Sequence, residues 1–229
     1  MSINIVEKID SLVKVRNILV SVCDKSGLDQ FIPDLVEINP DIQIFSTGGT
    51  YGRISEILGA SAGERLTQVS DFTGQPETQG GLVKTLDFKI YLGLLTETYN
   101  DAHQGDLKRT GSVPIDMVVV NLYPFKETIS KPDVSVEQAR GNIDIGGPCM
   151  IRASAKNYIR VASVVDPADY RKILSILKEN QGSTNLDLRF QLARKAFDHT
   201  AVYDRTIADF LVSKEIDDVN NCYELENKE

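Results

Sequence analysis

The chain has 229 residues, of which 41% are apolar, enough to bury one sizeable core with an attached helical part. Acidic residues outnumber basic ones by 33 to 25, giving a formal charge of -8 and a pI near 4.9. This balance disfavours a broad basic face, so nucleic acid is not expected as a partner. No apolar run reaches membrane-spanning length and the first residues lack a signal-peptide core, so we predict no membrane contact and a cytoplasmic location.

Cysteine and histidine usage argues against disulfides and metals. Cys23, Cys149 and Cys222 are odd in number and widely spaced, which is typical of reduced thiols. The two histidines, His103 and His199, have no neighbouring group of ligands at metal-binding spacing. We therefore predict no metal site.

Strands alternate with helices along the chain. The apolar run 16–22 predicts a strand, and a helix is predicted to begin at Ser26. Residues 42–45 predict a second strand, followed by the loop STGGT and a helix that extends to Leu58. The segment IDMVVVNL (115–122) predicts a strand buried on both faces, and residues 161–165 predict another.

The second half is predicted to be mostly helical. Helices are expected near 135–140, after the segment IDIGGP, after Pro167, and over 186–212. The pattern predicts an α/β fold with a parallel sheet, helices on both faces, and a ligand site at the carboxyl ends of the strands. The expected division is an N-terminal arm (1–15), one domain (16–214) that includes a C-terminal helical extension, and a frayed acidic tail (215–229).

Two loops favour an anion site. Glycines in the loop STGGT let backbone N–H groups turn toward a phosphate, and the following helix adds its positive end. An ordinary turn with a hydroxyl helix cap is the alternative. Lys25 lies in a second loop between a strand and a helix, where it can add charge to the same site, although a solvated lysine is more common.

A third cluster offers proton donors and acceptors. The segment DIGG begins at Asp144, Lys156 follows twelve residues later, and Asn121 and Tyr123 end the preceding strand. Burial can tune the pKa values of such groups for acid–base chemistry. Taken singly, each residue type is more often a cap, a turn or a surface charge.

Together these segments resemble one family. The segments VSVCDKSGL, STGGT, SDFTGQPE, VKTLDFK, IDMVVVNLYPFKET, NIDIGGPCMIRASAKN and VVDPADY are similar to the inosine monophosphate (IMP) cyclohydrolase module. In that family the module is the N-terminal part of a bifunctional purine-biosynthesis enzyme that also carries a formyltransferase. The resemblance covers roughly residues 18–214.

The resemblance implies a three-layer fold like that of methylglyoxal synthase, a homodimer, and no cofactor or metal. It implies ring closure of 5-formamidoimidazole-4-carboxamide ribotide (FAICAR) to IMP with loss of water. Carried over by motif, the nucleotide phosphate is expected at Ser21, Lys25, Ser46, Thr47, Gly48, Gly49 and Thr50. The reacting end is expected at Lys84, Thr85, Asn121, Tyr123, Asp144, Gly146 and Lys156.

The expected roles follow from the chemistry. The carboxamide nitrogen must attack the formyl carbon, so a proton must leave the nitrogen and the formyl oxygen must be stabilised. Tyr123 and Lys156 are assigned to proton movement near the carboxamide. Asp144, Lys84 and the Gly146 backbone are assigned to the formyl oxygen as it departs.

Some positions depart from the family pattern. This chain has Leu82 where the family has arginine, Asp87-Phe88 where the family has histidine-proline, and Tyr91 where the family has histidine. Cys23 stands where the family has a hydroxyl residue. Losing an arginine and gaining an aspartate removes donors and changes the charge. The first alternative is therefore a regulatory module of the same fold that binds purine nucleotides without turnover.

A second alternative is a triose-phosphate enzyme like methylglyoxal synthase, against which the segments NLYPF and IDIGGP argue. The length leaves no room for a formyltransferase domain, so we expect a free-standing module or a fragment that works with a separate formyltransferase.

Overall fold

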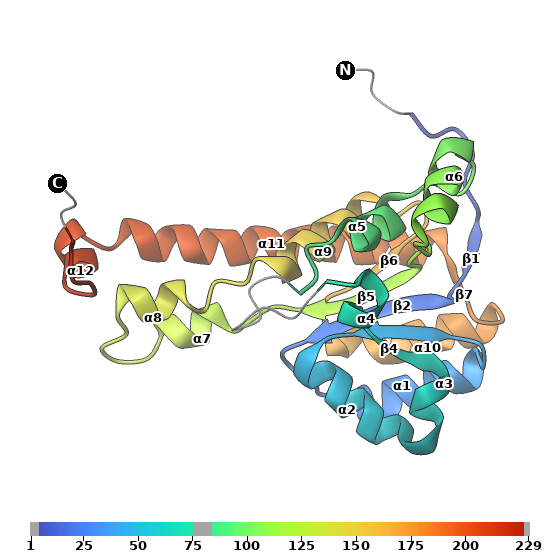
Figure 1. Cartoon of the computed structure of the whole chain (residues 1–229), viewed down its shortest axis with the longest axis horizontal. Coiled ribbons are helices and arrows are strands. Elements are labelled where there is room, and N and C mark those ends of the chain that lie inside the picture. The colour runs from blue at the N-terminus through green and yellow to red at the C-terminus, as the bar shows by residue number, and fades with distance from the viewer. Residues whose placement is uncertain (1–4, 76–83, 227–229) are drawn as a thin grey trace.

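The core of the protein is a parallel sheet of five strands in the order β4-β3-β2-β5-β6, seen in a computed structural model that describes residues 5–75 and 84–226 (Figure 1). The prediction of an α/β fold with a parallel sheet is confirmed. Because β2 lies at the centre and neighbours both β3 and β5, the chain reverses its direction of travel across the sheet there. The strands are β2 (Asn17–Val22), β3 (Gln43–Ser46), β4 (Leu66–Gln68), β5 (Met117–Asn121) and β6 (Ala162–Val164).

Alternate residues of the central strands point to opposite faces, so an uninterrupted apolar run feeds two cores. In β5, Met117 and Val119 join one cluster, whereas Val118 and Val120 join the other. The first cluster is covered by α1 (Leu28–Ile38), α2 (Gly48–Leu58) and α10 (Tyr170–Glu179). The second is covered by α5 (Phe88–Leu95), α9 (Gly146–Lys156) and α11 (Leu186–Val212).

Several short elements lack a clear sequence signal. Residues Leu12–Lys14, expected in a separate N-terminal arm, form β1, which pairs antiparallel with β7 (Ser183–Asn185). The edge strand β4 and the helix α6 (Asp101–Thr110) were not predicted either. The remaining elements are α3 (Ala62–Arg65), α4 (Val69–Thr73), α7 (Phe125–Ile129), α8 (Val136–Arg140), and the 3-10 turns Gly59–Ser61 and Pro167–Asp169.

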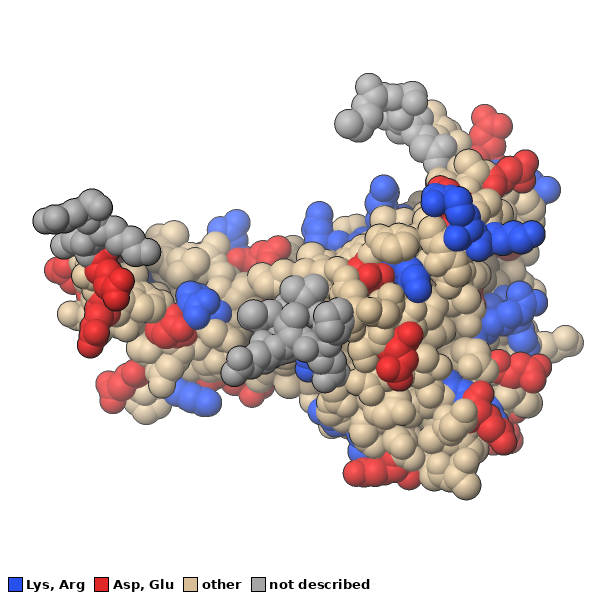
Figure 2. Space-filling view, in the orientation of Figure 1, with Lys and Arg blue, Asp and Glu red and all other residues tan. Residues whose placement is uncertain are grey.

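The helix α11 spans 27 residues, matches the predicted range, and forms the expected C-terminal extension. It continues past the sheet, where α7, α8 and α12 (Ile216–Asn220) lie along it (Figure 1). The acidic tail does not simply fray, because α12 forms within it and the Tyr223 hydroxyl bonds to Glu137. Acidic side chains lie on α12 at the tip of this end, with basic side chains close by, and the body also shows both signs interspersed on the visible face (Figure 2).

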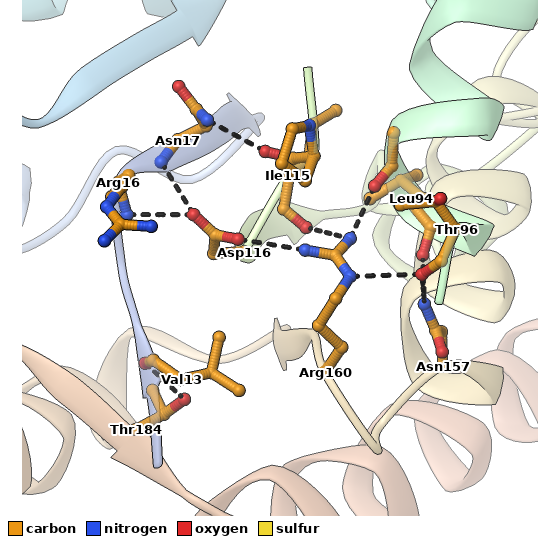
Figure 3. Close-up of polar contacts among 12 residues, drawn as sticks. Val13, Arg16, Asn17, Leu94, Thr96, Ile115, Asp116, Asn157, Arg160 and Thr184 are labelled. Carbon is orange, nitrogen blue, oxygen red and sulfur yellow. Dashed lines mark hydrogen bonds and ion pairs between the residues drawn. The ribbon is translucent and has the colours of Figure 1, made fainter. Parts of the chain in front are cut away.

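A buried ion pair ties the amino ends of the strands together (Figure 3). Nη1 of Arg160 lies 2.9 Å from Oδ1 of Asp116, and both side chains are under a tenth exposed. The other carboxylate oxygen of Asp116 accepts the N–H groups of Arg16 and Asn17, and Arg160 also donates to carbonyl groups around α5. Removing one partner of such a pair costs about 3–5 kcal/mol, so this network holds the edge opposite the site described below.

Candidate functional site

A cavity of about 410 Å³ opens at the carboxyl ends of β2, β3 and β5. It lies where strand order reverses in an open parallel sheet, the usual ligand position in such folds. Its volume falls in the range of about 300–1,000 Å³ found for small-molecule pockets. Among the expected site residues, the lining includes Ser21, Lys25, Thr47, Gly48, Gly49, Thr50, Lys84, Thr85, Asn121, Tyr123, Asp144 and Gly146.

One end of the cavity has the features of an anion site. Gly48 has a φ of +49°, a left-handed conformation that favours glycine, and it begins α2. Thr47 precedes the helix without capping it by its side chain, and its Oγ1 lies 3.2 Å from Oγ of Ser21. The first N–H groups of a helix have no partner within the helix. Two hydroxyls and a helix N-terminus therefore face the same space.

Lysine charge is concentrated at this end. A Cβ atom added to Gly48 would lie 3.4 Å from Nζ of Lys84, and one added to Gly49 would lie 4.0 Å from Cε of Lys25. The expectation that Lys25 comes beside the glycine loop agrees with this geometry. Lys84 was expected at the reacting end, but its ammonium group lies over the phosphate loop and so links the two ends.

Two expected phosphate ligands use their hydroxyls inside the protein. Ser46 is fully buried and donates to the carbonyl of Val20 at 2.7 Å, so it does not border the cavity. Oγ1 of Thr50 accepts the N–H of Val22 and donates to the Val22 carbonyl. These hydroxyls fasten the loop to β2, and Thr47 is the loop hydroxyl that remains available.

Asn121 also acts chiefly on the protein. Its Oδ1 accepts the N–H groups of Cys23 and Asp24 at 2.7 and 2.9 Å, and its Nδ2 donates to the Asp24 carbonyl at 2.8 Å. Because both ends of the amide are occupied, Asn121 holds the loop that carries Lys25 in place.

The other end of the cavity contains two titratable side chains, those of Tyr123 and Asp144. Oδ1 of Asp144 accepts the N–H of Gly147 at 2.9 Å. Burial raises the pKa of Asp144 above its ordinary value, although N–H groups of Gly147 and Tyr123 act in the opposite direction. Burial, and then the nearby Asp144 carboxylate, raise the pKa of Tyr123. A proton acceptor and a protonated phenol thus share this end.

The two glycines that follow Ile145, Gly146 and Gly147, have no space around them for a side chain. A Cβ atom at Gly146 would lie 2.6 Å from Oγ1 of Thr85, and one at Gly147 would lie 2.6 Å from Cδ2 of Leu122. The turn into α9 therefore packs directly on Thr85 and on the end of β5. This close approach brings the N-terminus of α9 to the reacting end.

Lys156 lies elsewhere. It is an exposed residue at the last position of α9, whereas the cavity borders the first residues, Gly146 and Gly147. Ten helical steps of about 1.5 Å separate Gly146 from Lys156, which places their Cα atoms about 15 Å apart. The described structure therefore does not bring Lys156 to this cavity.

The departures from the family pattern fall mostly outside the cavity lining. Asp87 is buried, and its carboxylate accepts the N–H of Lys89 at 2.8 Å, capping α5. Phe88 is exposed, and Tyr91 is half-buried beside Cys149. Leu82 lies outside the described residues. Cys23 borders the cavity, so its thiol takes the place of the family's hydroxyl there.

Sequence analysis missed part of the site. The lining includes the apolar residues Leu86, Ile143, Ile145 and Met150, which lie beside the predicted polar ones. It also missed Tyr203 of α11, whose hydroxyl accepts the N–H of Asp144 at 2.8 Å. Tyr203 follows the helical apolar pattern of α11, so its type and spacing carry no signal of this contact.

In the described residues, no group of three or more His, Cys, Asp or Glu side chains is arranged to hold a metal ion. None of the helices in this part of the chain combines the length and apolar character that crossing a membrane requires.

Comparison with known proteins agrees with this architecture. Residues 27–149 match the family model described as MGS-like domain, and residues 154–229 match the model AICARFT/IMPCHase bienzyme. The crystal structure of ForH superimposes with a TM-score of 0.74 at 28% identity, covering 86% of this chain and 96% of the ForH chain.

Curated relatives are longer than this chain. The chain is 46% identical over 197 residues to the bifunctional purine biosynthesis protein PurH of Ruminiclostridium cellulolyticum, covering 86% of this chain and 37% of the relative. The PurH proteins of Bacillus subtilis and Thermoanaerobacter sp. are 46% and 48% identical over 199 residues; each comparison covers 87% of this chain, and 37% and 38% of those proteins respectively. The chain thus spans little more than a third of their length. By its family-model match and its fold, the chain belongs to the MGS-like domain family, and it is homologous to part of PurH.

Proposed function

We propose that this protein closes the second ring of a purine nucleotide, converting FAICAR to IMP with release of water. The observation that carries the proposal is one cavity with an anion end around Gly48 and a proton-transfer end around Tyr123 and Asp144. A phosphorylated ribotide would match this arrangement, because its phosphate lies at one end of the molecule and its two reactive groups lie at the other. The similarity to PurH, named as a bifunctional purine biosynthesis protein, supports the same assignment.

At the anion end, binding would fix the substrate by its phosphate. The N–H groups that begin α2, the hydroxyls of Ser21 and Thr47, and the lysines Lys25 and Lys84 would surround the phosphate oxygens. These contacts are equal in substrate, transition state and product. They therefore supply affinity and position rather than acceleration.

At the reacting end, a C–N bond forms and a C–O bond breaks. The carboxamide nitrogen attacks the formyl carbon and loses a proton. Because Lys156 does not border the cavity, we assign this proton to the Asp144 carboxylate and the formyl oxygen to Tyr123, which exchanges the roles expected from the sequence. The formyl oxygen takes up two protons and leaves as water, and Tyr123 is the nearby donor. These two protons balance the one lost by the carboxamide nitrogen and the one lost by the formamido nitrogen as its C=N bond forms. Lys84 and the N–H groups that begin α9 would stabilise negative charge on that oxygen.

The decisive experiment is an ultraviolet assay of ring closure with purified protein and FAICAR. Turnover above the uncatalysed rate is expected, together with IMP binding measured by calorimetry. If IMP binds but FAICAR is not converted, the catalytic proposal fails and a binding role remains. If neither occurs, the cavity does not accept purine ribotides.

The second candidate is a non-catalytic module that binds purine nucleotides. The observation in its favour is that Asp87 and Tyr91 replace family residues with side chains that border no part of the described cavity. Such a chain would keep the anion end and lose reactive groups at the other end. The same assay distinguishes the candidates, because a binding module gives an IMP isotherm without turnover.

We further propose a cytoplasmic homodimer that works beside a formyltransferase, in the same chain or a separate one. The arm formed by α7, α8, α12 and the end of α11 exposes the apolar side chains Val202, Leu211, Val212 and Ile216, which suits a contact between two copies. In such a dimer, Lys156 of one copy would be able to approach the cavity of the other copy. Light scattering at micromolar concentration tests the dimer, and a monomeric mass would contradict it.

A further inference from the structure

One side chain of the long C-terminal helix contacts both segments that build the reacting end. The Tyr203 hydroxyl accepts the backbone N–H of Asp144 at 2.8 Å, across 59 residues of sequence. Its ring packs edge-on against Phe125, with centroids 6.2 Å apart, and Phe125 follows Tyr123 by two residues. Tyr203 itself is only 9% exposed, so it is fixed by packing.

The turn from Asn142 to Gly147 is held from two sides. On the sheet side, Gly146 and Gly147 lie against Thr85 and Leu122 without room for a Cβ atom. On the helix side, the Tyr203 hydroxyl bonds to the Asp144 N–H and lies 3.5 Å from the Asn142 carbonyl oxygen. Among the described residues, no other side chain accepts the backbone N–H of Asp144. The hydroxyl is therefore the side-chain contact that fixes this turn from the side of α11.

Burial favours the protonated form of this hydroxyl. Removal from solvent raises the pKa of Tyr203 above its ordinary value, with the N–H of Asp144 acting in the opposite direction and the Asp144 charge adding to the increase. A neutral phenol can accept one N–H and donate to one carbonyl at the same time. This is the arrangement found between Asp144 and Asn142.

We propose that Tyr203 is a positioning residue that sets the place of the Asp144 turn, which makes α11 a working part of the reacting end. The inference rests on the proposed function, because it concerns the geometry of the proton acceptor. Tyr203 borders no part of the cavity among the described residues, so it acts through Asp144 and not on the substrate. The anion end is built from β2, β3 and α2 and is independent of this contact.

The test is Tyr203→Phe, which keeps the ring packed on Phe125 and removes only the hydroxyl. Misplacement of a reacting group by about 1 Å can cost roughly 100-fold in rate, so kcat should fall by roughly 10- to 100-fold. KM and the IMP dissociation constant should change by less than about threefold, since the anion end is intact. Tyr99→Phe is the matched control: it removes a hydroxyl that bonds to Asp10, neither residue borders the cavity, and the change should leave turnover unchanged.

A second readout does not depend on turnover. Amide hydrogen exchange should be faster at Asp144 in Tyr203→Phe than in the wild type, while the rest of α9 stays protected. Wild-type kcat in the variant would overturn the proposal. A rise of KM together with unfolding at a lower temperature would also overturn it, because that combination shows a purely structural role.

Failure of the proposed function is distinguishable from failure of this inference. If the wild type does not convert FAICAR, the proposed function fails, and the exchange experiment alone decides the role of Tyr203. Faster exchange at Asp144 would then support positioning of the turn, and unchanged exchange would reject it.

Discussion

The two ends of the cavity are built in different ways. The anion end comes from two short loops, each directly after a strand, with Lys84 reaching over from a third segment. The reacting end combines Thr85, Tyr123, Asp144 and Gly146, and it is held from behind by Tyr203 of the C-terminal helix. The comparison teaches that a candidate phosphate site can be encoded within a few consecutive residues, whereas the proposed proton-transfer site depends on contacts between distant segments.

The largest expected effect is at the reacting end. Asp144→Asn keeps the shape of the side chain and removes its ability to accept a proton, so kcat for ring closure should fall by roughly 10²- to 10⁴-fold. The IMP dissociation constant should stay within about threefold, because the anion end is untouched. Steady-state kinetics and calorimetry on the same preparation measure both. A loss of affinity as large as the loss of kcat would show that the two ends are not separable.

The matching change at the anion end is Gly48→Ala. An alanine at φ +49° is strained, and its Cβ would meet Nζ of Lys84 at 3.4 Å. We expect IMP to bind roughly tenfold more weakly or worse, with a smaller change in kcat at saturating substrate.

Gly52→Ala in the same helix is the control for that experiment. Nothing lies within 4 Å of a Cβ atom at Gly52, and its φ needs no glycine. Alanine there should leave IMP affinity unchanged and stabilise the fold by about 0.5–1 kcal/mol through helix propensity. Equal binding by both alanine variants would mean that IMP does not use the α2 loop.

Substitution of Asn121, which lies between the two ends of the cavity, tests whether this residue supports the anion end, the reacting end or both. Asn121→Ala leaves the N–H groups of Cys23 and Asp24 without their acceptor, so the loop that carries Lys25 should loosen. We expect a loss of roughly 1–2 kcal/mol in unfolding free energy and a severalfold weaker affinity for IMP. Denaturant titration and calorimetry check this. A loss of kcat without a loss of affinity would instead indicate direct contact with the reacting groups.

The smallest expected effect is a difference in pH response. Asp144 accepts a proton only as the carboxylate, and burial raises its pKa above 3.8, so kcat should fall as pH falls through a value higher than that. Affinity should respond instead near the second pKa of a phosphate ester, about 6. The profiles of kcat and of the IMP dissociation constant measure the two. An acid limb in kcat at or below pH 3.8 would contradict a raised pKa of Asp144.

The long-range geometry shows what the sequence could not at three kinds of position. Ser46 and Thr50 belong to a phosphate-loop motif, but their hydroxyls donate to carbonyl groups of β2. Buried backbone carbonyls at the end of a strand need hydrogen-bond donors, and these hydroxyls supply them. Lys156 shares a motif with Asp144, yet a helix of eleven residues separates it from the cavity. Tyr203 has no motif at all, and only the packing of α11 on the rest of the fold reveals its contact.

What the sequence by itself determined is the local part of this protein. Apolar runs in the strands, helical spacing such as that of 186–212, and the glycine loop after β3 depend on neighbours within a few residues, so the α/β fold and the anion end were predictable. Only the tertiary structure decided which polar side chains face the cavity and which support the backbone. That choice depends on strand order and helix packing, which bring together residues such as Asp144 and Tyr203 that are distant in the chain.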